Sequence, residues 1–333
     1  MSCLYVTEVG ATINFVGQRI EVKTKHDSRS VPIELLESIE IYGKAQMTSH
    51  AMCECMRRNI PVSFHKSSGY YLGRLNPPGG TNVARQRMQF RLTEDDSFSL
   101  NLAKRFISAK IHNQIVLLRR YSKNNNYKAN DEIATMLKVE HRLERCTSSE
   151  ELIGCEGYAA RTYFQGMGRL VDEAFSFQGR SRRPPEDEFN AMISYGYSML
   201  FHEIYAKVEK RGLNSYLAFL HKDKESHPAL VSDLMEEWRP VIVDSTVMSL
   251  LNGHEITKEH FDIPEDKNGI FLNKEGRKIF ISKMEKKFRS EMRYLAYVDY
   301  EVSFRRGLDL QVNQLIKAME EQDPDTYMPV RIR

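Results

Sequence analysis

The stretch 221–240 combines a histidine and several acidic residues with the apolar pattern of a helix. Its apolar residues recur at three-, four- and seven-residue steps behind Pro228, which predicts a helix with one buried side. Asp233 and Glu236 are neighbours on such a helix, and two like charges this close repel each other unless a cation lies nearby. His221 ends the apolar segment that precedes the helix. Together these side chains predict half of a divalent metal site.

Glu156 is another acidic residue whose position points to chemistry. Ser148 and Glu151 have the spacing of a capping box, so we expect a helix to start there. Glu156 then lies at the edge of the apolar stripe of this helix, and a carboxylate on a packed face must be paired, protonated or bound to a metal. Arg161 and Arg169 are possible partners, so the residues alone leave both an ion pair and a metal site open.

Two further histidines are weaker candidates. His202 lies within an apolar helical pattern, so we expect a core histidine there rather than a ligand. His227 lies in a polar loop and lacks the ordered apolar segment that precedes His221. The sequence has no Gly-rich phosphate loop of Walker type and no convincing Ser-His-Asp spacing, which argues against two common enzyme classes.

Basic residues gather in two places. The net charge of +3 is too small to indicate nucleic-acid binding by itself, but residues 97–130 contain no acidic residue. This stretch has helical spacing, so its cations either cover a solvated face or follow a phosphate backbone. An arginine cluster before Pro184 is expected to face solvent, and beside a carboxylate metal site it favours DNA contact. The candidate DNA contacts are Lys104, Arg105, Lys110, Arg119, Arg120, Arg180, Arg182 and Arg183.

The composition is typical of a soluble globular protein: 333 residues, 41% of them hydrophobic and 28% charged, leave room for two domains. Residues 1–80 alternate apolar and polar positions as β-strands do, around one helix that Ser49 is expected to cap. NPPGG at 76–80 predicts a linker. Helical spacing dominates 81–333, apart from a hairpin predicted at 269–282. The predicted fold class is therefore α+β.

Location and redox state are also indicated by the sequence. Apolar runs stay far below the roughly 20 residues that span a bilayer, and the start lacks the pattern of a signal peptide, so we expect a cytoplasmic protein that does not enter a membrane. The five cysteines lack paired C-x-x-C spacing. They are expected to be buried thiols in a reducing compartment.

Four segments, taken in order, resemble the Cas1 family of CRISPR-associated integrases, which insert new spacers into a CRISPR array. They are CEGYAARTYF at 155–164, RRPPEDEFNAMISYGYSML at 182–200, LAFLHKDKESHPALVSDLMEEWRP at 217–240 and the closing TYMPVRIR. The last segment is similar to the end of type I-C-like members. The resemblance covers essentially the whole chain, and Ala218 stands where the family commonly has glycine.

The resemblance implies a small N-terminal β-sandwich domain for dimerisation at 1–80, followed by a larger all-α domain for catalysis and DNA binding at 81–333. It implies that Glu156, His221 and Glu236 bind a metal, with Asp233 assisting. One nitrogen and carboxylate oxygens suit Mg²⁺ or Mn²⁺. The implied reaction joins the 3′-hydroxyl ends of prespacer DNA to the CRISPR repeat by transesterification, and the same site would cleave DNA. The implied partners are DNA, a second copy of the chain and a Cas2 dimer.

Three alternatives stay open at this point. The chain is either an integrase, a metal-dependent DNA nuclease without integration activity, or a non-catalytic DNA-binding scaffold whose polar residues form a buried ion-pair network. Convergence of the three implied ligands on one point would separate the enzymes from the scaffold. The role of His221 as metal ligand or as general base is equally open.

Overall fold

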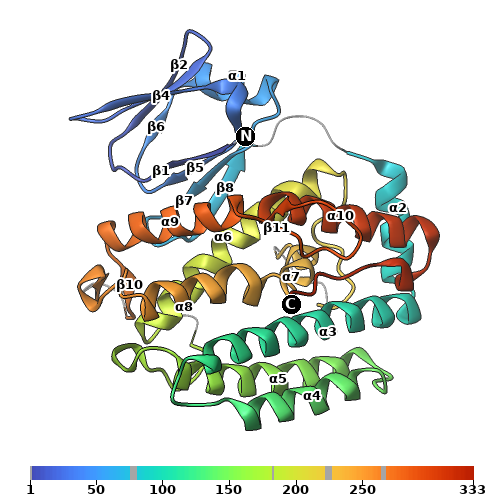
Figure 1. The fold of residues 1–333 in the computed structure, drawn as a ribbon. Coiled ribbons are helices and arrows are strands. Elements are labelled where there is room, and N and C mark those ends of the chain that lie inside the picture. Colours follow the sequence, from blue (N-terminus) through green and yellow to red (C-terminus); the bar gives the residue numbers. More distant parts are fainter. Residues whose placement is uncertain (1, 76–80, 182–183, 222–226, 264–267) are drawn as a thin grey trace. The chain divides into compact units, whose positions relative to one another are not determined.

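The computed structural model describes residues 2–75, 81–181, 184–221, 227–263 and 268–333. The chain divides into two compact units, Met1–Gly80 and Thr81–Arg333 (Figure 1). Its mixed α+β architecture agrees with the predicted fold class. The roles predicted for the two units, dimerisation and catalysis, stay predictions.

The first unit contains two four-stranded sheets, with orders β1-β5-β7-β8 and β4-β3-β2-β6. In the first sheet β5 pairs in parallel with β1 and β7, whereas in the second β3 pairs antiparallel with both neighbours. The strands are β1 (Ser2–Val6), β2 (Thr12–Val16), β3 (Arg19–Lys23), β4 (Ser28–Pro32), β5 (Leu36–Tyr42), β6 (Gln46–Met47), β7 (Val62–His65) and β8 (Tyr71–Leu75).

One hydrophobic core serves both sheets, because alternate side chains of each strand point inward. Ile13 and Ile20 of one sheet lie in the same buried cluster as Ile39 and Val62 of the other. Helix α1 (Ser49–Arg57) adds its apolar side to this cluster. Its N-cap is Thr48, whose hydroxyl accepts from a backbone N–H of the first turn, so the predicted cap at Ser49 is one residue too late.

The second unit is mainly helical but carries two short ribbons, so "all-α" is too strict a description. The ribbons are β9 (Phe261–Asp262) with β10 (Phe271–Leu272), and β11 (Glu291–Met292) with β12 (Val302–Ser303). The helices are α2 (Val83–Thr93), α3 (Asp96–Lys123), α4 (Asn130–Leu143), α5 (Ser149–Leu170), α6 (Glu188–Lys210), α7 (Ala229–Met235), α8 (Ser245–Asn252), α9 (Lys274–Arg289) and α10 (Phe304–Glu321).

The hairpin predicted at 269–282 is wrong, because its second half belongs to helix α9. Asn273 caps this helix by accepting from the backbone N–H of Gly276. Phe280 and Met284 then recur at helical spacing and are fully buried. An N-cap followed by this period outweighs the short alternating pattern at 278–282.

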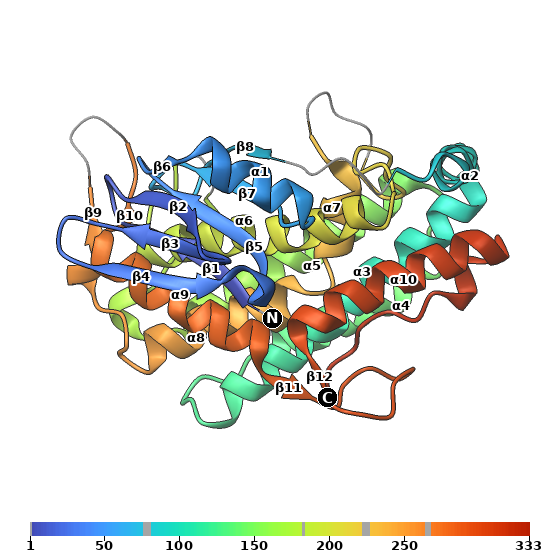
Figure 2. The ribbon, with the colours of Figure 1, turned by 90° about the horizontal axis from the view of Figure 1, so that it is seen from above.

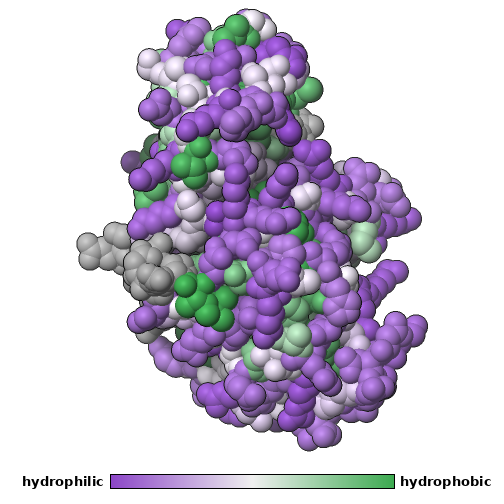
Figure 3. Space-filling view, turned by 90° about the vertical axis from the view of Figure 1, so that its left-hand side faces the viewer, coloured by the Kyte–Doolittle hydropathy of each residue, from purple (hydrophilic) through white to green (hydrophobic). Residues whose placement is uncertain are grey.

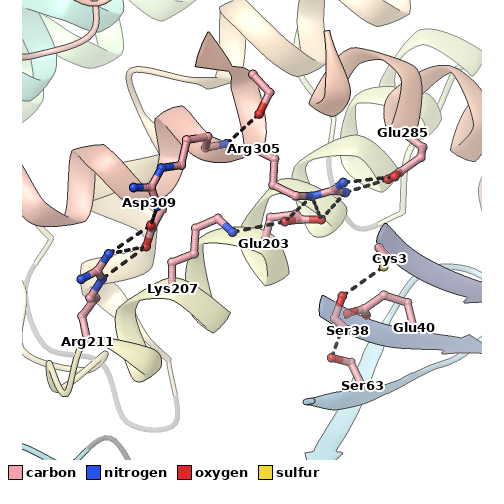
Figure 4. Close-up of polar contacts among 12 residues, drawn as sticks. Cys3, Ser38, Glu40, Ser63, Glu203, Lys207, Arg211, Glu285, Arg305 and Asp309 are labelled. Atoms are coloured by element: carbon pink, nitrogen blue, oxygen red, sulfur yellow. Dashed lines mark hydrogen bonds and ion pairs between the residues drawn. The ribbon is translucent and has the colours of Figure 1, made fainter. Parts of the chain in front are cut away.

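Helices α3, α4 and α5 pack against one another and form the green layer in Figure 1. Helices α6, α9 and α10 are linked by buried ion pairs. The buried guanidinium of Arg305 on α10 contacts Glu203 of α6 at 2.8 Å and Glu285 of α9 at 2.7 Å (Figure 4). Burial opposes ionisation of Glu203, but Arg305 holds the pKa of this carboxyl below its usual value. Arg211 extends the link by pairing with Asp309 (Figure 4).

The described helices include none that is long and apolar enough to cross a membrane. The face drawn in Figure 3 is correspondingly dominated by hydrophilic residues, and its hydrophobic residues form small separate patches. Such scattered apolar residues are normal on a protein surface.

Candidate active site

Two carboxylates from different parts of the chain converge on one lysine. Lys110 lies on α3, and its ammonium nitrogen lies 2.5 Å from Glu236 Oε2 and also contacts Glu156 Oε1. Glu156 comes from α5, and Glu236 from the turn directly after α7. The Lys110 and Glu236 side chains are 7% and 4% exposed, whereas Glu156 is 25% exposed. The cluster is therefore buried at its base and open on the Glu156 side.

Opposite charges keep this cluster ionised despite its burial. Burial alone would raise the pKa of Glu236, but Arg239 and Lys110 lower it to about 2. Arg239 contacts the other carboxylate oxygen of Glu236 at 3.2 Å. Burial would lower the pKa of Lys110, but Glu236 and Glu156 hold it above its usual value. At neutral pH Glu236, Lys110 and Arg239 are consequently charged.

His221 and Asp233 form a second pair close to this cluster. Asp233 is fully buried, and its Oδ1 lies 2.7 Å from His221 Nδ1. The same carboxylate accepts backbone N–H groups from Phe219, Leu220 and His221 at 2.8, 2.9 and 3.1 Å. Burial opposes protonation of the ring, but Asp233 raises the pKa of His221. Asp233 thus fixes both the backbone and the ring orientation of His221, as carboxylates do for ligand histidines.

The backbone widens shortly after Glu236, from Arg239 onward. The sequence predicts one helix through 241, but α7 ends at Met235 and residues Arg239–Asp244 form a π-helix. Pro240 explains the change, because it has no N–H to donate to the carbonyl four residues earlier and its ring clashes with that carbonyl. π-Helical turns are frequent at functional sites. Trp238 is fully buried here, and its indole N–H donates to Gln311 at 2.7 Å.

The last residues of the described chain lie against the same turn and against α3, beside which Figure 1 draws the C-terminus. The Asn113 amide donates to the carbonyls of Glu237 and Val330, and its oxygen accepts from Ile332 N–H, all at 2.9 Å. Glu237 accepts from Val330 N–H at 2.7 Å and contacts the Tyr327 hydroxyl at 2.7 Å. Glu236 therefore faces Lys110, while Glu237 faces the terminal segment.

Sequence reasoning missed Lys110 as a site residue and placed it among the DNA contacts. The structure corrects this, because Lys110 is buried and paired with two carboxylates. The sequence does contain a signal that Lys110 is buried, because Lys110 lies four residues after Phe106 and therefore on the buried side of the helix. The Glu156 partners suggested from the sequence also differ, since Arg169 instead contacts Glu132 and Tyr127.

The predicted metal ligands fall into two pairs. Within the described ranges, no group of three or more His, Cys, Asp and Glu side chains is placed to hold a metal ion. Glu156 and Glu236 share Lys110, and His221 is bonded to Asp233. The metal site thus stays a prediction. His202 is buried within α6, as expected, and His227 contacts the hydroxyl of Ser232 on α7 at 2.9 Å.

The predicted DNA contacts differ in exposure and in whether they already contact other residues of the chain. Arg119 and Arg120 are exposed on α3, whereas Lys104 donates to a carbonyl of Glu144 and Arg105 pairs with an aspartate near the C-terminus. Arg182 and Arg183 lie outside the described residues.

Arg180 does not face solvent as expected. Its guanidinium donates to Asn190 Oδ1 at 2.7 Å and to Ser194 Oγ at 3.1 Å, both on α6, and lies over the Tyr197 ring. These acceptors lie on one side of α6 and orient the arginine toward the helix. The prediction considered only the loop that carries Arg180 and not the helix beside it.

Glu237→Gln is expected to stabilise the chain at alkaline pH. Burial raises the pKa of Glu237 to about 8, so the folded chain keeps a proton that the unfolded chain releases near its ordinary pKa of 4.5. The stability that this proton provides is complete below about pH 4.5 and is lost as the pH rises through about 8, by up to roughly 1.4 kcal/mol per pH unit. The neutral amide does not titrate, so urea unfolding of the variant should depend less on pH between about 5 and 9.

The matched control is Glu275→Gln, which alters an exposed glutamate on α9. This variant should keep the pH dependence of the unmodified chain. Equal pH slopes for Glu237→Gln and the unmodified chain would show that Glu237 does not hold its proton in the folded state.

Known proteins share both the sequence and the fold. A family model described as CRISPR associated protein Cas1 matches residues 4–286. The chain is 34% identical over 330 residues to the CRISPR-associated endonuclease Cas1 of Mycobacterium tuberculosis (strain ATCC 25618 / H37Rv), which covers 99% of this chain and 97% of that protein. It is 31% identical over 335 residues to a Cas1 endonuclease of Thermus thermophilus, with 99% and 97% covered.

Solved structures extend this likeness. A CAS1 protein from Thermotoga maritima superposes with a TM-score of 0.82 at 23% identity, covering 96% of this chain and 97% of that one. A casposase bound to integration product gives 0.83 at 24% identity, with 97% and 92% covered, and at these identities both show the fold alone. A chain of a Cas6-RT-Cas1–Cas2 complex gives 0.84 at 25% identity, covering 99% of this chain and 36% of that one. With a family model over most of its length and relatives above 30% identity along nearly all of it, the chain belongs to the Cas1 family.

Proposed function

We propose that this chain is a CRISPR adaptation integrase, which joins the 3′-hydroxyl ends of prespacer DNA to the CRISPR repeat and cleaves DNA at the same site. The observation that carries the proposal is the pair of carboxylates, Glu156 and Glu236, which come from different parts of the chain and converge on one cation position. Curated relatives named as Cas1 endonucleases support the nuclease activity. The fold shared with a casposase bound to integration product supports strand joining.

The residues present fit a divalent metal ion. Glu236 Oε2 is buried, and it lies 2.5 Å from the Lys110 ammonium, so this oxygen already faces a cation. Such an atom is suited to ligate a cation. We propose that Glu156, Glu236 and His221 hold Mg²⁺ or Mn²⁺, because carboxylate oxygens and an imidazole nitrogen suit both ions. When bound, the ion supplies Lewis-acid stabilisation of the phosphodiester under attack.

The remaining residues position this set. Asp233 orients the His221 ring, so that Nε2 is the ring nitrogen left for a ligand role. Arg239 holds Glu236 through its second oxygen and lies over the Tyr197 ring, which fixes the guanidinium plane. These contacts restrict the side chains of His221 and Glu236 before DNA arrives, which reduces the entropy cost of reaching the reactive arrangement.

DNA and protein partners belong to the same proposal. Solved relatives include a Cas1–DNA complex and Cas6-RT-Cas1–Cas2 complexes, which support DNA and Cas2 as partners of this chain. We propose a homodimer formed through the β-rich unit and assembled with a Cas2 dimer. The closing TYMPVRIR supports a type I-C-like system.

An integration assay tests the function directly. Prespacer DNA with free 3′-hydroxyl ends is mixed with a supercoiled CRISPR plasmid and Mn²⁺, with and without Cas2, and joined products are counted. The integrase proposal expects products joined at the repeat. Cleavage without joining would favour a nuclease that lacks integration activity, and DNA binding without either reaction would favour a scaffold.

Arg182→Ala combined with Arg183→Ala is expected to weaken DNA binding. Each phosphate contact that is lost should reduce the slope of log affinity against log salt by roughly 0.9, and so by about 2 for both arginines. Fluorescence anisotropy with labelled DNA over a salt series measures this slope.

Lys25→Ala combined with Arg29→Ala removes the same charge from exposed positions of the β-rich unit. This control should leave the slope almost unchanged. An unaltered slope in the Arg182 and Arg183 variant would remove the arginine loop from the DNA interface.

A further inference from the structure

We infer that Lys110 is a built-in counter-ion, which occupies the metal position between Glu156 and Glu236 and withdraws when a divalent cation binds. The inference rests on the proposed metal-dependent function and assigns a positioning residue to it. Lys110 belongs to α3, which supplies none of the proposed ligands.

The position of the ammonium group is the first argument. Lys110 Nζ lies 2.5 Å from Glu236 Oε2 and also contacts Glu156 Oε1. Oxygen ligands surround divalent metal ions at about 2.0–2.6 Å. An ion bound by both carboxylates would therefore require the space that the Lys110 nitrogen fills, so the two cations exclude each other.

Charge balance is the second argument. Two ionised carboxylates that share a buried site repel each other strongly unless cations compensate them. Lys110 contacts both carboxylates and Arg239 contacts Glu236, so two formal positive charges face two formal negative charges. A divalent ion added to this cluster would leave two positive charges in excess. Withdrawal of Lys110 would remove one of these two excess charges.

The shape of the side chain allows this exchange. Lysine carries a point charge on a flexible four-carbon stem, whereas the Arg239 guanidinium is planar and fixed over the Tyr197 ring. The side chain of Glu156 is partly exposed, so the cluster has an opening toward which the stem of Lys110 can turn. Lys110 is therefore the cation of the cluster that is able to leave.

Lys110→Met is the direct test, because methionine keeps the apolar stem and removes the charge. Mn²⁺ binding to the full-length chain is measured by isothermal titration calorimetry without DNA. Loss of the competing cation should lower the Mn²⁺ dissociation constant on the order of tenfold. Without Mn²⁺, the melting temperature of Lys110→Met should be lower than that of the unmodified chain. Addition of Mn²⁺ should raise the melting temperature of Lys110→Met more than that of the unmodified chain.

Lys104→Met is the matched control, since Lys104 lies on the same helix and donates to a backbone carbonyl outside the cluster. It should bind Mn²⁺ as the unmodified chain does. If these two proteins bind Mn²⁺ and Lys110→Met binds no more tightly, the counter-ion inference is overturned and the proposed metal site stands. If neither the unmodified chain nor Lys110→Met binds Mn²⁺, the metal-dependent function and the inference both fail.

A measurement on the unmodified chain covers the case in which Lys110→Met does not fold. Lysine acetylation by a brief pulse of an amine-reactive reagent is read by mass spectrometry with and without Mn²⁺. Modification of Lys110 should increase several-fold in Mn²⁺, because its nitrogen leaves the two carboxylates, while modification of Lys104 should not change. Equal modification of Lys110 under both conditions would overturn the inference.

Discussion

Glu156→Ala is expected to abolish joining of prespacer DNA to a CRISPR plasmid in the presence of Mn²⁺, while DNA binding is kept. The side chain is one of the two carboxylates that converge on Lys110, and alanine leaves Glu236 as the remaining acidic partner of that cation. Loss of one preorganised electrostatic group in an active site reduces rates on the order of 10² to 10³. Because Glu156 is partly exposed, its removal should change the melting temperature little.

Glu150→Ala provides the control on the same helix. Glu150 is exposed in the first turn of α5, and its truncation should leave strand joining close to that of the unmodified chain. Joined products are measured by gel, and DNA affinity by anisotropy, on the same preparations. Joining by Glu156→Ala at the rate of the Glu150→Ala control would remove Glu156 from the active site.

Local signals allowed much of the fold to be predicted. The Ser148 side chain caps α5 where the sequence suggests, because a cap depends on residues within one turn. The linker signal at 76–80 adjoins the division between the two units. At 269–282 two local signals conflict: the alternating pattern predicts a hairpin, whereas the Asn273 cap and the helical period after it produce α9.

The ion-pair and hydrogen-bond partners of buried charged side chains are less predictable, since these partners lie far apart in the chain. The ion-pair partners considered for Glu156 were neighbours on its own helix, but the structure pairs it with Lys110, 46 positions away. Arg180 was expected in solvent and instead finds acceptors on α6, ten and fourteen positions away. A cation within an apolar stripe is a signal of burial, and it requires an anion that the sequence alone does not identify.

The turn that contains Glu236 and Glu237 is a second feature that the sequence alone does not predict. The sequence predicts a continuous helix, in which adjacent residues would point about 100° apart on one smooth surface. Pro240 converts the segment to a π-helix, and Trp238 and Gln311 fix it from the other side. The sequence shows that two adjacent glutamates are present. Tertiary packing then determines where their carboxylates lie and in which direction each one points.

Asn113→Ala is expected to destabilise the second unit by roughly 3–5 kcal/mol and to release the terminal segment. Asn113 is fully buried and makes three hydrogen bonds, to Glu237, Val330 and Ile332. Each backbone group left without its partner costs about 1–3 kcal/mol. Because Asn113 lies one helical turn after Lys110, the loss should also loosen the turn that carries Glu236. Urea unfolding measures the stability, and limited proteolysis measures release of the segment.

A truncation separates the role of the terminal segment from that of the helix. Removing residues 327–333 takes away two of the three Asn113 partners, so the truncated chain should lose little more when Asn113→Ala is added, and the two changes should be far from additive. Asn101→Ala, at an exposed position of the same helix, should alter stability by less than about 0.5 kcal/mol in either background. Fully additive losses would mean that Asn113 does not act by holding the terminal segment, and that α3 and the turn at Glu236 are positioned independently of it.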